Sequence, residues 1–124
     1  MWEVKDIFAN RKRFRQYAKK HFNEFASCFK NLDRLRAALE DGMTLQQCSF
    51  GFFGSEGKDV YRIGQSGIPN AHETRLYIYV EIAGTEIYLL TIGDKNTQSL
   101  DIEWCHTIVE QIRKRKTNEN EGQN

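Results

Sequence analysis

Proline is almost absent from this sequence of 124 residues, which contains it once, and cysteine occurs only three times. An odd number of widely separated cysteines fits neither a disulfide framework nor a zinc site built on paired cysteines, so we expect reduced thiols in a core. No apolar run approaches the roughly 20 residues of a membrane-spanning helix, and the N-terminus lacks the apolar stretch of a secretory signal. These absences predict a cytoplasmic protein without a membrane partner.

Motifs of several enzyme classes are missing as well. The sequence contains no HExxH, P-loop or GxSxG pattern, so metal hydrolysis, nucleotide hydrolysis and serine-esterase chemistry have no support. We therefore predict no metal and no small-molecule cofactor.

What is present describes one ordinary globular domain. Hydrophobic residues make up 40% and charged residues 28% of the chain, and this length suffices for one core without disulfides or metals. We assign residues 1–116 to a single domain. The last eight residues, 117–124, contain no apolar side chain and are predicted to be a disordered tail.

The net charge of +1 hides a strongly basic N-terminal segment. Its basic residues are Lys5, Arg11, Lys12, Arg13, Arg15, Lys19 and Lys20, and a second basic block runs from Arg113 to Lys116. Such blocks either meet phosphates or form a solvated helix face, and for each block alone the solvated face is favoured.

Hydrophobic periodicity predicts the elements of the first half. Residues 2–5 read as a short strand, followed by a basic amphipathic helix to about residue 20. A longer helix begins near Asn23 and ends before Gly42, a position suited to a left-handed cap. Its apolar residues at helical spacing are Phe22, Phe25, Phe29, Leu32, Leu35 and Leu39. The two helices are predicted to form a hairpin on a sheet.

In the second half the period changes to two. Strands are predicted at 49–54, 58–65, 73–82 and 85–92, and Ser99 is expected to cap a last helix. The fold class is therefore α+β: an N-terminal helical hairpin packed on a twisted, mainly antiparallel sheet of three to five strands, with a C-terminal helix.

With this order of elements, three segments resemble a known family. Val60–Ile63, Thr74–Tyr79 and Leu89–Asn96 make residues 1–115 similar to the RelE/ParE toxin superfamily, and closest to its HigB-like branch. The resemblance implies a RelE-like fold and a type II toxin that cleaves mRNA in the ribosomal A site without a metal. It also implies a cognate antitoxin as partner.

The resemblance also implies the site. Arg75 aligns with the family's arginine, Arg62 with a basic position on the neighbouring strand, and Lys95 with a basic residue after the last strand. Guanidinium groups suit phosphate oxygens, so these three are the predicted catalytic set. Tyr77 and Tyr79 share a strand face with Arg75 and are expected to stack on bases of the message.

Weaker candidates complete the set. Lys58 is a further predicted RNA contact, and His72 and His106 titrate near neutrality and could move protons, although neither shows a fixed partner in the sequence. Arg75 has an alternative role as the cross-strand partner of Glu81 or Glu86.

A second class of function stays open at this stage. The predicted sheet carries many acidic residues, which repel RNA. The alternative is a non-catalytic binding module on the same fold, either a gyrase-directed inhibitor of the ParE type or a protein-interaction domain.

Overall fold

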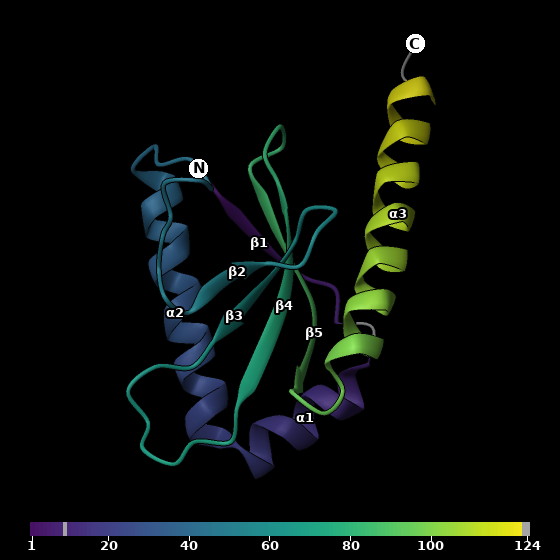
Figure 1. Cartoon of the computed structure of the whole chain (residues 1–124). Helices are drawn as coiled ribbons and strands as arrows, with labels where there is room; N and C mark the ends of the chain where they lie inside the picture. The colour runs from purple at the N-terminus through teal and green to yellow at the C-terminus, as the bar shows by residue number, and fades with distance from the viewer. Residues whose placement is uncertain (9, 123–124) are drawn as a thin grey trace.

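The computed structural model describes the backbone of residues 1–8 and 10–122, and side chains up to Glu119. One sheet lies between two helical layers: α1 and α2 pack on one face and α3 on the other (Figure 1). The predicted α+β fold with an N-terminal hairpin and a C-terminal helix is confirmed. Among the helices of the described residues, none combines the length and apolarity needed to cross a bilayer.

The sheet of the described residues has five strands in the order β1-β5-β4-β3-β2. Their bounds are Glu3–Asp6 for β1, Phe53–Ser55 for β2, Val60–Gly64 for β3, Thr74–Glu81 for β4 and Glu86–Asp94 for β5. β1 pairs with β5 in parallel, and the other neighbours are antiparallel. β2 begins later than predicted because the chain turns before it, with Phe53 N donating to Phe50 O.

The hairpin consists of α1 (Arg11–Lys20) and α2 (Phe22–Glu40). Asn10 Oδ1 accepts from Arg13 N and caps α1. His21 joins the two helices. At the end of α2, Gly42 has φ +88 and its N–H donates to Leu39 O, as expected for a glycine in a left-handed cap.

The last helix, α3 (Gln98–Gly122), is longer than predicted at both ends. It starts after Thr97, whose carbonyl accepts from Asp101 N, so Ser99 is not its cap. The predicted disordered tail is helical as far as Gly122, because neither proline nor an earlier glycine stops the helix. Residues 123 and 124 lie outside the described residues.

Each face of the sheet has its own core. Leu76, Ile78 and Val80 of β4 pack with α1 and α2, whereas Tyr77 and Tyr79 pack with α3. The cysteines are free and buried, as predicted: Cys28, Cys48 and Cys105.

Candidate functional site

The face of β4 that the sequence predicts to be open to RNA is covered by α3. Tyr77 is fully buried and Tyr79 is 4% exposed, in one cluster with Val109 of α3. The predicted base stacking by the two tyrosines is therefore wrong. Periodicity identified the apolar side of α3, but it did not tell which sheet face that side covers.

Arg62 and Arg75 do come together, as predicted. They line a cavity of about 230 Å³ with Gln65 and Glu73, which we call the arginine pocket. Both side chains lie on the α3 side of the sheet, since Arg62 faces Tyr77 across the strands and Arg75 lies two residues from it. The structure thus places two of the three predicted catalytic cations in one pocket.

Each arginine is held by its own glutamate. Arg75 Nη2 donates to Glu73 Oε1 at 2.9 Å, and Arg62 forms an ion pair with Glu56. Two cations and two carboxylates cancel, so the arginine pocket attracts a phosphate weakly. Glu81 and Glu86, the partners considered for Arg75, both bind Lys116 instead.

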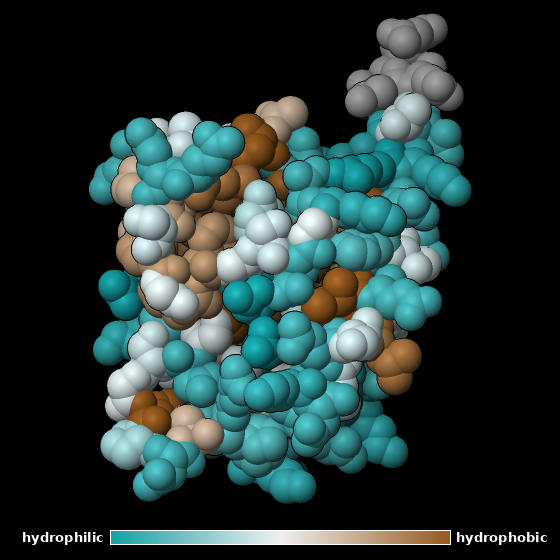
Figure 2. Space-filling model, in the orientation of Figure 1, coloured by the Kyte–Doolittle hydropathy of each residue, from teal (hydrophilic) through white to brown (hydrophobic). Residues whose placement is uncertain are grey.

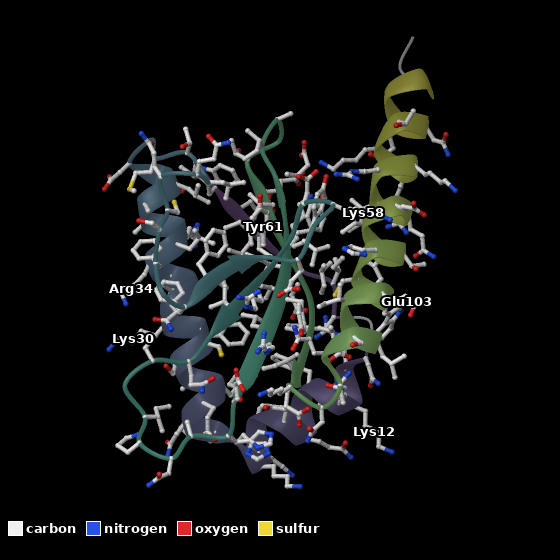
Figure 3. All side chains as sticks on the ribbon, in the orientation of Figure 1. Lys12, Lys30, Arg34, Lys58, Tyr61 and Glu103 are labelled. Atoms are coloured by element: carbon white, nitrogen blue, oxygen red, sulfur yellow. The ribbon has the colours of Figure 1, made fainter. Side chains whose placement is uncertain are left out.

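The other predicted site residues Lys95, Lys58 and His106 lie outside the arginine pocket. Lys95 is exposed in the turn after β5 and does not line the arginine pocket. Lys58 is exposed in the β2–β3 turn, near α3 (Figure 3). His106 Nε2 lies 3.1 Å from the carbonyl oxygens of Glu56 and Gly57, a contact that fastens α3 to this turn.

His72, in contrast, has a fixed partner, and both that partner and the ring on which His72 stacks line a cavity. Its Nε2 lies 3.1 Å from Asp94 Oδ2, and its ring stacks on His21 with centroids 4.1 Å apart and planes 6° from parallel. His21 and Asp94 line a cavity of about 210 Å³ with Tyr17 and Lys20. We call this cavity, together with His72, the histidine pocket.

A chain of hydrogen bonds fixes the position of His72. The Thr74 hydroxyl donates to His72 O at 2.9 Å, so the 2.7 Å bond between Tyr17 and Thr74 must use the tyrosine proton. Glu24 Oε2 accepts from His72 N at 3.2 Å and lies 3.8 Å from His21 Nδ1. The loop histidine is therefore anchored to both α1 and α2.

The surroundings of the histidine pocket shift the pKa values of His21 and Asp94. Burial, and then the neighbouring His72, lower the pKa of His21, which favours its neutral form. Burial acts to raise the pKa of Asp94, but hydrogen bonds from His72, Thr97 and Asn96 outweigh it and hold this pKa below its usual value. At neutral pH the pocket thus contains a neutral imidazole and a carboxylate-bound imidazole.

The pocket opens beside the basic helix α1. Arg13 is tied to Asp101 at 2.7 Å, and Arg11 pairs with Asp6. The other basic side chains of α1 are exposed and have no carboxylate within 4 Å among the described residues: Lys12, Arg15, Lys19 and Lys20. These cations give α1 an unbalanced positive charge, which the paired charges of the arginine pocket do not provide.

His21 and Asp94 were missed by sequence reasoning. The only signal was a histidine in the loop before β4, because the separation of 22 positions between His72 and Asp94 matches no recognisable motif. Within the described residues no group of three or more His, Cys, Asp or Glu side chains is arranged to hold a metal ion. Comparisons of the chain with protein-family models, curated proteins and solved structures gave no match.

Proposed function

We propose that the protein is a metal-independent endoribonuclease, the toxin of a type II toxin-antitoxin pair that cleaves ribosome-bound mRNA in the cytoplasm. The ribosome, the toxin role and the cognate antitoxin rest on the resemblance of its strand segments. The cleavage chemistry rests on one observation, the stacked pair of His21 and His72 bound to Asp94 beside the basic helix α1.

The proposed reaction is attack of a ribose 2′-hydroxyl on the adjacent phosphorus. His21, neutral at pH 7, accepts the 2′-hydroxyl proton, and the bond from phosphorus to the 5′-oxygen breaks as the new bond forms. His72, whose Nε2 is bound to Asp94, gives a proton to the leaving 5′-oxygen. The products are a 2′,3′-cyclic phosphate and a 5′-hydroxyl, and such paired proton transfer contributes about 10²–10⁴-fold per group.

The lysines and arginines of α1 bind the phosphates of the RNA. Lys20 lines the histidine pocket, and further exposed lysines and arginines lie on the same helix. Neutralised phosphates release counterions, so affinity falls steeply with salt. The arginine pocket takes no part in this step.

One observation favours the alternative of a non-catalytic binding module. Glu56 and Glu73 neutralise the charge of Arg62 and Arg75, two of the three residues that the family resemblance assigns to catalysis. A gyrase inhibitor or protein-interaction domain on this fold would need no proton transfer.

Mapping mRNA ends in a bacterial translation extract tests the proposal. Wild type should produce new ends, His72→Gln and His21→Gln should not, and His106→Gln is the matched control because its ring lies outside the pocket. No cleavage by wild type would favour the binding module, and unchanged cleavage by His72→Gln would reject the assigned site.

A further inference from the structure

Phe50, Phe52 and Arg34 form a layered surface beside α2, which we call the aromatic platform. The two rings stack with centroids 4.9 Å apart and planes 12° from parallel. The guanidinium carbon of Arg34 lies 5.3 Å from one ring centre and 5.1 Å from the other. Both rings are partly exposed, and an apolar area is visible on this side of the molecule (Figure 2).

Phe50 and Phe52 pack against the core on the α2 side of the sheet. An apolar cover needs no cation, yet Arg34 lies over both rings and has no carboxylate within 4 Å among the described residues. Its guanidinium retains donors for an anion. Arg34 and Lys30 both project outward from α2 on this side (Figure 3). Asp33, which lies between them in the sequence, is also exposed.

We propose that the aromatic platform binds the bases of single-stranded RNA. This inference rests on the proposed function and deepens it by naming the form of the substrate. A base face stacks on an aromatic ring whatever its sequence, a contact that contributes about 1–3 kcal/mol per base, and arginine adds a cation–π contact. Bases within a duplex are already stacked on one another, so the platform selects unpaired segments.

The platform lies well away from the cleavage site. Arg34 is 13 residues beyond His21 on α2, which corresponds to about 20 Å at ~1.5 Å per residue. It therefore holds nucleotides several steps from the scissile bond. Long substrates should benefit from the platform, whereas dinucleotides should not.

Binding of fluorescein-labelled oligomers that cannot be cleaved tests this inference. We would compare a 2′-O-methyl uridine oligomer of about 12 nucleotides with an abasic oligomer of the same length, using fluorescence anisotropy. The double variant Phe50→Leu/Phe52→Leu should lose about 5–150-fold in affinity for the first oligomer, the equivalent of ~1–3 kcal/mol, and none for the second. Phe22→Leu, at a ring that is 65% exposed, is the matched control.

The outcomes separate this inference from the proposed function. Equal affinities of the double variant and wild type, or equal losses for both oligomers, would overturn the platform even if cleavage is confirmed. If wild type binds the oligomers through their bases but does not cleave mRNA, only the proposed nuclease activity would be rejected. Phe52→Tyr keeps the aromatic face and should stay within about twofold of wild type, and a tenfold loss in this variant would also overturn the platform. If the double variant fails to fold, Phe50→Leu alone must show the base-dependent loss.

Discussion

The arginine pocket and the histidine pocket contain similar numbers of polar side chains but differ in how their charges are paired. In the arginine pocket each guanidinium already has a glutamate, through Glu73 and Glu56. In the histidine pocket, one carboxylate, Asp94, is bound to one of two stacked imidazoles. The first arrangement cancels charge, and the second places two imidazoles side by side with one carboxylate, the arrangement that the proposed proton transfers use.

The difference shows that residue type is a poor guide to chemistry without its partners. An arginine is a suitable phosphate-binding group, but an ion pair with a neighbouring glutamate neutralises its charge within the fold. A histidine is commonly structural, yet one whose ring is held by a carboxylate and whose stacked neighbour has a lowered pKa is suited to proton transfer.

The largest expected effect is on cleavage. His72→Gln should reduce the rate by about 10²–10⁴-fold because it removes the proton donor, whereas Arg75→Gln should reduce it by less than about tenfold. Single-turnover cleavage of a labelled oligonucleotide at saturating protein measures both. A greater loss in Arg75→Gln than in His72→Gln would reverse the comparison of the two pockets.

The pH dependence should identify the base. Cleavage requires neutral His21, whose pKa lies below the ordinary value of about 6.5, so the rate should fall about tenfold per pH unit only below that lowered pKa. The same shift means that the folded state resists protonation, and stability should decline as pH falls from about 6.5 through the lowered pKa. A rate profile measured between about pH 4 and 8 shows the acid limb, and an unchanged limb in His21→Gln would exclude this residue as the base.

Two buried tyrosines provide a stability comparison between the pockets. Tyr17 donates a 2.7 Å hydrogen bond to Thr74 below the histidine pocket, whereas the Tyr77 hydroxyl, on the strand face of the arginine pocket, has no partner among the described residues. Tyr17→Phe should reduce the free energy of unfolding by about 1 kcal/mol, and Tyr77→Phe should leave it unchanged or raise it slightly. Urea unfolding of both variants measures the contrast. Equal losses would mean that the two hydroxyls are equally satisfied in solution.

Sequence periodicity predicted the elements well because each helix buries one side and the two faces of each central strand carry different kinds of side chain. The spacing of Phe25, Leu32 and Leu39 defines α2, and alternation along Thr74–Glu81 defines β4. The position of Gly42 also follows from local chemistry, since its φ of +88 favours glycine.

The candidate site was harder to predict because it depends on contacts between distant segments. Alternation places Tyr77 and Arg75 on one face, but only the packing of α3 decides that this face is a core. The contact between His72 and Asp94 depends on the path of the loop before β4, which has no periodic pattern. Tertiary contacts of this kind leave no trace in local spacing.

The smallest expected effect tests whether glutamates weaken the binding of RNA by the arginine pocket. Glu73 is about half exposed and its pair with Arg75 is only partly screened from water, so Glu73→Gln should release a guanidinium at a cost of less than about 1 kcal/mol in stability. RNA affinity should rise by about twofold, more at low salt than at high salt, because one more cation then faces the polyanion. Glu103→Gln on the outer side of α3 changes the net charge equally and is the matched control (Figure 3). Equal gains in RNA affinity in both variants would mean that only the net charge matters. The pairing of Glu73 with Arg75 would then not be the reason why the arginine pocket binds RNA weakly.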